Sequence, residues 1–156
     1  MIHVECDADQ TLVMTLGVPR KEIKHVHAKG NVCNRLEKGR RTKGLIDEDP
    51  LSLQPRYVRR LRLLSDEKQI KLYHDKIAEN YLIMLCPRLE EWVLKVAREV
   101  GIDISEYGLP DDADKLHTAL NIKSKLENFE KLIEDIKERS GMLKTLEGFI
   151  RGSRAE

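Results

Sequence analysis

Short apolar stretches alternate with segments of helical periodicity through the first hundred residues of the chain. Strands are predicted at residues 2–6, 23–28, 44–46, 69–73 and 81–85. Helices are predicted at residues 10–16, 32–38, 55–64 and 87–100. Gly17 and Gly39 stop the first two helices, residues 29–31 form a turn, and Pro50 ends the third strand region. Strands that alternate with helices in this way predict βαβ units and a mainly parallel sheet.

The pattern changes at a loop over residues 108–112. Beyond it there are no strand candidates, and apolar residues recur at helical spacing at Ile122, Leu126, Phe129, Leu132, Ile133 and Ile136. We therefore expect a compact, Rossmann-like α/β domain over residues 1–107 and a helical C-terminal extension over residues 108–156. The apolar stripe of the extension either packs on the same domain or serves a protein partner or a second copy of the chain. Packing on the same domain is favoured, because an orphan apolar stripe on a monomer is unusual.

Composition narrows the class of protein further. A chain of 156 residues with 40% hydrophobic and 35% charged residues is typical of one folded domain with an appendage. Cys6, Cys33 and Cys86 lack CxxC spacing, so neither a disulfide framework nor a zinc site is indicated. No apolar run reaches membrane-spanning length and no leader pattern is present, which favours a cytoplasmic protein that does not bind membranes.

The net charge of +1 hides an uneven distribution. Residues 19–65 hold 13 Lys or Arg against 5 Asp or Glu. Such a basic segment attracts a polyanion such as DNA or RNA, or it is simply the solvated face of surface helices. The candidate phosphate contacts are Lys29, Arg56, Arg59 and Arg60.

Acidic residues stand where the predicted strands end. Glu5 closes the first strand, and Asp47 and Asp49 follow the third. Because ligands bind outside the carboxyl ends of parallel strands, these carboxylates are expected to converge on one edge of the sheet. Alternating residues of an extended segment point the same way, so Asp47 and Asp49 are expected to reach one ion together. Carboxylate oxygens suit Mg²⁺ or Mn²⁺.

The acidic residues other than Glu5 also have a purely structural interpretation. Asp beside Pro50 is common in turns, which would account for Asp47 and Asp49. Asp9 can cap the first predicted helix, and Glu90 lies in the first turn of a later helix, where the helix dipole favours acids.

Two motifs together resemble a known family. The segment Glu5-Cys6-Asp7-Ala8-Asp9 after a first strand, and Asp47-Glu48-Asp49 after a later one, are similar to the motifs of the TOPRIM domain. That domain is shared by topoisomerases, bacterial primases and nucleases of the overcoming-lysogenization-defect type. Cys6 stands where the family usually has glycine. The resemblance covers residues 1 to about 100.

The resemblance implies roles for individual residues. Glu5 would be the acid/base glutamate, Asp47 and Asp49 the metal-binding pair, and Asp9 the aspartate of the first motif. The segment CPRLEEW at residues 86–92 is similar to a helix start in RloB-type proteins, with Leu89 in place of the usual aromatic residue, and this likeness adds Glu90 as an acidic site residue.

The implied function is a metal-dependent nuclease or a related phosphoryl-transfer enzyme acting on DNA or RNA with Mg²⁺ or Mn²⁺. Two alternatives stay open at this point. One is a non-catalytic module that binds nucleic acid or a protein partner and uses its metal for structure. The other is a doubly wound domain whose acids are turn residues and whose ligand is of another kind.

Overall fold

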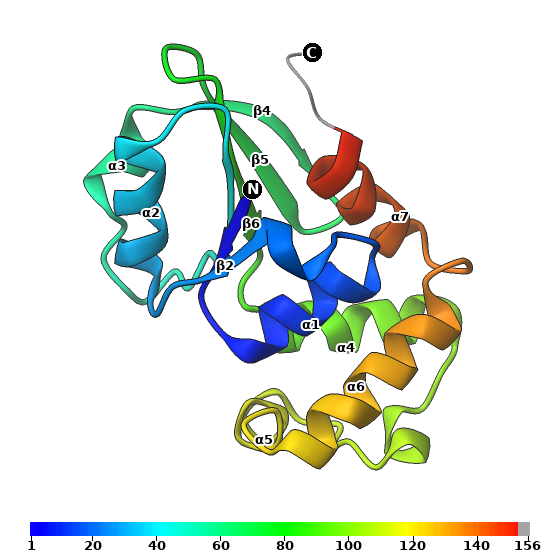
Figure 1. Ribbon diagram of the computed structural model, residues 1–156. Coiled ribbons are helices and arrows are strands. Elements are labelled where there is room, and N and C mark those ends of the chain that lie inside the picture. The colour runs from blue at the N-terminus through cyan, green and yellow to red at the C-terminus, as the bar shows by residue number, and fades with distance from the viewer. Residues whose placement is uncertain (153–156) are drawn as a thin grey trace.

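A computed structural model describes residues 1–152 of the protein (Figure 1). Six strands form one sheet in the order β2-β1-β3-β6-β5-β4. The strands are β1 (Ile2–Val4), β2 (Ile23–His25), β3 (Lys43–Asp47), β4 (Arg62–Glu67), β5 (Ile70–Asp75) and β6 (Asn80–Leu85). The helices of the α/β part are α1 (Asp7–Thr15), η1 (Arg20–Glu22), α2 (Lys29–Lys38), α3 (Arg56–Arg59), α4 (Leu89–Val100) and η2 (Ile104–Tyr107). Those of the extension are α5 (Ala113–Ala119), α6 (Lys123–Ile136), α7 (Gly141–Glu147) and the π-helical turn η3 (Gly148–Gly152).

The sheet is mixed. Strands β2, β1, β3 and β6 are parallel neighbours, whereas β5 and β4 continue the sheet as antiparallel strands. The chain leaves β1 toward β2 on one side and returns to β3 on the other, so the strand order reverses between β1 and β3. The prediction of an α/β fold with a largely parallel sheet is therefore confirmed, with an antiparallel pair added at one edge.

Helices cover both faces of the sheet (Figure 1). Successive residues of β3 point to opposite faces: Leu45 joins the larger buried cluster with α1, α4 and α6, and Ile46 joins the smaller one with α2 and α3. Gly44 lies on the face of α2, where an added Cβ would approach the side chain of Val32 to 2.7 Å. The absence of a side chain at Gly44 thus allows α2 to pack closely on the sheet.

Two local predictions were wrong. The predicted turn at residues 29–31 is the first turn of α2, which begins at Lys29. The predicted helix at residues 55–64 is reduced to the four residues of α3, and the chain then forms strand β4 from Arg62. The amphipathic pattern is correct for the first turn, because Tyr57 and Val58 pack inward from α3. Beyond Arg60, the backbone hydrogen bonds of the hairpin with β5 outweigh the helical propensity of the segment.

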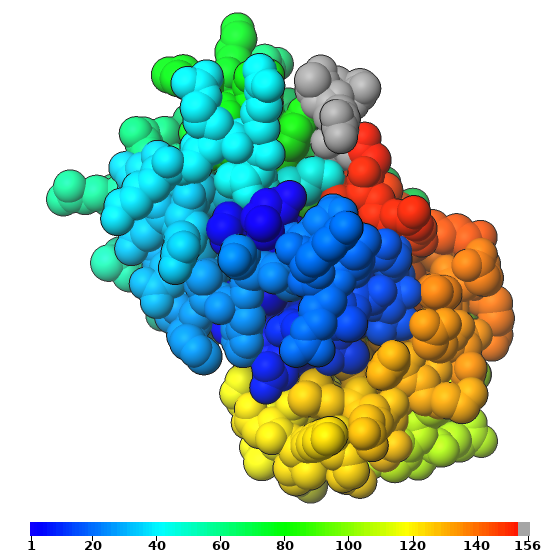
Figure 2. All heavy atoms as spheres, viewed as in Figure 1, coloured from blue at the N-terminus to red at the C-terminus, as the bar shows by residue number. Residues whose placement is uncertain are grey.

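The helical extension packs on the α/β part, as favoured from the sequence. Phe129, Leu132 and Ile133 of α6 are fully buried in the same apolar cluster as Leu12 of α1. Figure 2 shows the spheres of the C-terminal helices directly against those of the N-terminal segment. The pairing of α1 with α6 places the extension next to the carboxyl end of β1.

Candidate carboxylate site

Four acidic residues gather at the carboxyl ends of the parallel strands. Glu5 follows β1, and Asp47 is the last residue of β3. Asp9 is in the first turn of α1, and Glu90 is in the first turn of α4, the helix that follows β6. The strand register brings these positions together, because Val4 of β1 pairs with Leu45 of β3 and Asp47 pairs with Leu85 of β6.

Backbone hydrogen bonds hold two of these carboxylates in place. The amide of Glu5 donates to Asp9 Oδ2 at 3.2 Å, which ties the first turn of α1 to the end of β1. The amide of Leu89 donates to Asp47 Oδ1 at 3.0 Å, which ties the start of α4 to the end of β3. Asp9 and Asp47 therefore have fixed positions at the junctions of strand and helix.

Burial and mutual repulsion raise the pKa values of three members. Burial raises the pKa of Glu5 to about 7, against the opposing effects of Lys29 and of a backbone hydrogen bond from Asp47. Burial also raises the pKa of Asp9, which is 2% exposed, and the charge of Glu5 raises it further. The pKa of Asp47 is raised by burial and then by the charges of Asp9, Glu5 and Glu90. The four carboxylates thus form one electrostatically coupled cluster.

The donor chemistry of the cluster fits a divalent cation. Glu5 Oε1 and Glu90 Oε1 are buried without a hydrogen-bond partner among the described residues. Buried carboxylate oxygens are rarely left in this state, and oxygen donors are those that Mg²⁺ and Mn²⁺ prefer. No group of three or more His, Cys, Asp or Glu side chains within residues 1–152 stands close enough together to hold a metal ion. Coordination of a cation by the cluster therefore requires its side chains to draw closer.

Asp49 differs from the other predicted metal ligands. Strand β3 ends at Asp47, and Asp49 has a left-handed backbone with φ of 45°. The extended geometry that would aim Asp47 and Asp49 in one direction is therefore absent. The amide of Asp49 donates to the carbonyl of Pro87 at 2.7 Å, and its charge still raises the pKa of Glu5. Asp49 lies at the border of the cluster.

Lys29 lies at the same edge, at the start of α2. Its Nζ donates to the carbonyl oxygen of Glu48 at 2.9 Å and to Ser52 Oγ at 3.1 Å. Gln54 Nε2 donates to the same carbonyl at 2.7 Å. Lys29 therefore anchors the loop that follows β3, and it is near enough to Glu5 to lower the pKa of that carboxyl.

The three candidate arginines are on or next to α3, and they differ in their contacts. Arg56 and Arg59 are exposed. Arg60 pairs with Glu37 of α2 at 2.9 Å, and its guanidinium lies 5.2 Å from the centre of the Tyr57 ring. Arg56 and Arg59 are consequently better placed than Arg60 to contact a phosphate backbone.

Sequence reasoning missed three side chains that contact this edge. Lys71 of β5 pairs with Glu48 at 2.8 Å. His25 lies 3.2 Å from the carbonyl oxygen of Glu5 through its Nε2. His117 of α5 lies 3.1 Å from Glu90 Oε2 through its Nδ1. Nothing in the spacing of His117 indicates this contact, since 27 residues separate it from Glu90.

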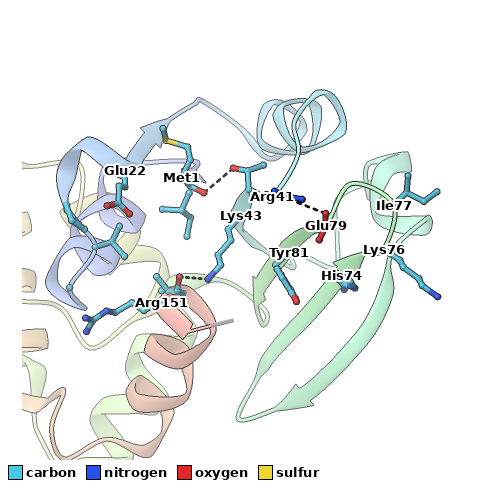
Figure 3. A pocket seen from close by; sticks show the side chains of 16 residues that line it. Met1, Glu22, Arg41, Lys43, His74, Lys76, Ile77, Glu79, Tyr81 and Arg151 are labelled. Atoms are coloured by element: carbon cyan, nitrogen blue, oxygen red, sulfur yellow. Dashed lines mark hydrogen bonds and ion pairs between the residues drawn. The ribbon is translucent and has the colours of Figure 1, made fainter. Parts of the chain in front are cut away.

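A separate cavity of about 970 Å³ opens at the opposite edge of the sheet (Figure 3). Two of the cations that line it have partners within the protein. Arg41 pairs with Glu79 at 3.2 Å, and Lys43 Nζ donates to the carbonyl oxygens of Phe149 and Ile150. The hydrogen bonds of Lys43 hold η3 against the sheet at this cavity. The cavity lies at the amino ends of the parallel strands, away from the carboxylates.

Comparison of the chain with family models, with curated proteins and with solved structures found no match. The resemblance to TOPRIM domains therefore rests on the sequence motifs. None of the helices within residues 1–152 has the length and apolar character needed to cross a membrane.

Proposed function

We propose that the protein is a TOPRIM-like phosphoryl-transfer enzyme, specifically a nuclease that cleaves DNA or RNA with Mg²⁺ or Mn²⁺. The observation that carries the proposal is the coupled cluster of Glu5, Asp9, Asp47 and Glu90 at the carboxyl ends of β1, β3 and β6. Several buried carboxylates that raise one another's pKa are costly for folding and are typical of a functional site.

The residues divide into two roles in this proposal. Asp47, Asp9 and Glu90 would hold the divalent cation, with Asp49 at the border of the cluster. The bound ion would neutralise charge on the phosphate and polarise the scissile phosphodiester. Glu5 would accept the proton of the attacking water, for which its unpaired Oε1 is available. Arg56, Arg59 and Lys29 would position the nucleic-acid backbone.

Labelled single-stranded DNA, duplex DNA and RNA incubated with Mg²⁺ or Mn²⁺ test the proposal. We expect cleavage that EDTA abolishes and that falls about 100-fold or more in Glu5→Gln and in Asp47→Asn. A matched control is available on α6: Glu90→Gln should lose activity, whereas Glu130→Gln, at an exposed glutamate of that helix, should keep it. Cleavage that is unchanged in Asp47→Asn would refute the assignment of the site.

The exposed arginines of α3 favour one alternative, a non-catalytic module that binds nucleic acid. In that case the protein would bind labelled nucleic acid with a steep dependence on salt and would not cleave it under any metal condition. The same substrates, measured by fluorescence anisotropy and by gel, separate the two functions.

A further inference from the structure

The helical extension brings one histidine into contact with the carboxylate cluster. His117 projects from α5, and its Nδ1 lies 3.1 Å from Glu90 Oε2. We propose that His117 is a positioning residue of the metal site, which fixes Glu90 so that its second oxygen remains available to the cation. This inference rests on the proposed function, because it assigns a role within the same site.

Glu90 needs such a partner. The residue is 4% exposed, and a carboxylate removed from water to this extent is unfavourable unless hydrogen bonds compensate. Its Oε1 has no hydrogen-bond partner among the described residues. Its Oε2 is bonded by His117. A ring N–H that donates to one carboxylate oxygen restricts the rotation of the side chain and leaves the other oxygen as a potential ligand.

Helix α5 is held firmly against the start of α4. Leu116, the neighbour of His117, is fully buried in the large apolar cluster. The guanidinium of Arg88, at the N-terminus of α4, bonds to Asp114 of α5 at 3.0 Å as well as to Glu91. These contacts set the position of His117 relative to Glu90 from outside the cluster itself.

The histidine side chain is largely exposed, which indicates that it is not held in place as part of the apolar core. It is 63% exposed, whereas the Glu90 side chain is 6% exposed. The ring thus bonds to Glu90 Oε2 while most of the histidine side chain faces solvent. A residue required for the apolar core would be buried instead, and the core contribution of α5 comes from Leu116 and Ala119.

The test compares Mn²⁺ affinity, measured by calorimetry, in His117→Ala, His117→Asn and the exposed neighbour Thr118→Ala. We expect His117→Ala to weaken Mn²⁺ binding about tenfold or more, as is typical of residues that orient a metal ligand. The side-chain NH₂ of asparagine can replace Nδ1 as the donor, so His117→Asn should recover most of the affinity. Thr118→Ala should bind Mn²⁺ as the unmodified protein does.

Asp47→Asn, measured alongside, separates this inference from the proposed function. Weak binding in Asp47→Asn together with unchanged binding in His117→Ala would overturn the role of His117 and leave the metal site intact. Equal losses in His117→Ala and His117→Asn would also overturn it, because the donated hydrogen bond would then not matter. Unchanged binding in Asp47→Asn, or no binding by the unmodified protein, would refute the metal site and the role of His117 with it.

Discussion

At the scale of single residues, the dominant feature is a group of buried carboxyl groups that disfavour one another's ionisation. Glu5, Asp9 and Asp47 have pKa values raised first by loss of water and then by one another. Each raised pKa is a free-energy difference between the folded and unfolded protein, about 1.4 kcal/mol per unit. Stability of the metal-free protein should therefore respond to pH and to removal of a single charge.

The metal-free protein should become less stable as pH rises from about 4.5 to about 7. The folded protein keeps the Glu5 proton up to a pKa of about 7, whereas the unfolded chain loses it near the ordinary glutamate pKa of 4.5. The stabilisation is thus complete below the unfolded pKa and is lost as pH rises through the folded pKa, an effect of at most about 3.5 kcal/mol from this group. Urea unfolding in EDTA at pH 5 and pH 8 measures the difference, and Glu5→Gln should reduce it. A flat profile in the unmodified protein would contradict the raised pKa.

Asp47→Asn should stabilise the metal-free protein at pH 8. Burial and the charges of Asp9 and Glu5 disfavour the ionised form of Asp47, so the folded protein must bind a proton there that the unfolded chain has lost at pH 8. Asparagine is neutral without this proton, and its Oδ1 can still accept the hydrogen bond from Leu89. We expect a gain of about 1–2 kcal/mol, in the range commonly found when a strained functional site is relieved. Thermal unfolding in EDTA compares it with Asp111→Asn, an exposed aspartate in the loop before α5, for which no change is expected. Added Mn²⁺ should stabilise the unmodified protein more than the variant.

At the scale of elements, α3 packs beside the C-terminal part of α2, where Arg60 pairs with Glu37. The hydroxyl of Tyr57 donates to Asp75 at the end of β5, next to the amino end of β6. Helix α3 follows the loop anchored by Lys29, and it carries Arg56 and Arg59 on its exposed surface. In the proposed function, a nucleic acid bound at the carboxylates would therefore extend from Lys29 along α2 to reach these arginines.

The double substitution Arg56→Ala/Arg59→Ala should weaken nucleic-acid binding and reduce its salt dependence. Each lost phosphate contact lowers the slope of log affinity against log salt by about 0.7–0.9. Fluorescence anisotropy over a series of salt concentrations measures this slope. Arg20→Ala/Lys21→Ala removes the same charge from η1, before the amino end of β2, and should leave the slope unchanged. Equal effects of the two double variants would indicate nonspecific attraction rather than a contact surface on α3.

At the scale of the whole molecule, the extension and the sheet share one apolar core. Phe129 and Leu132 of α6 are fully buried in the cluster that includes Leu12 of α1 and Trp92 of α4. The division at residue 107, predicted from the sequence, therefore does not coincide with a break in the core.

A chain ending at residue 107 should lose cooperative folding, because it would expose the surfaces that α6 and α7 cover. A milder test is Phe129→Ala, which should destabilise the full chain by about 3–5 kcal/mol through the cavity that it leaves. Denaturant unfolding followed by circular dichroism measures both effects. The exposed Ile122→Ala, at the start of α6, provides the control with little expected change. A truncated chain that unfolds cooperatively would instead support two independent units.

The features that the sequence alone determined are those with a local physical cause. The strands β1, β3 and β6 were predicted because short apolar runs that end at acidic, glycine or proline residues are typical of buried strands. The positions of Glu5 and Asp47 followed from the strand ends, because parallel strands bring their carboxyl ends to one edge.

The features that only the tertiary structure decided depend on contacts between distant residues. Strand β4 exists because β5 pairs with it, so its helix-like spacing was overruled by interstrand hydrogen bonds. The buried state of Asp9 and Glu90 depends on how α1 and α4 pack, and the contact of His117 depends on where α5 docks. Local periodicity reports which face of an element is apolar, but the partner that covers that face is chosen by packing across the whole chain.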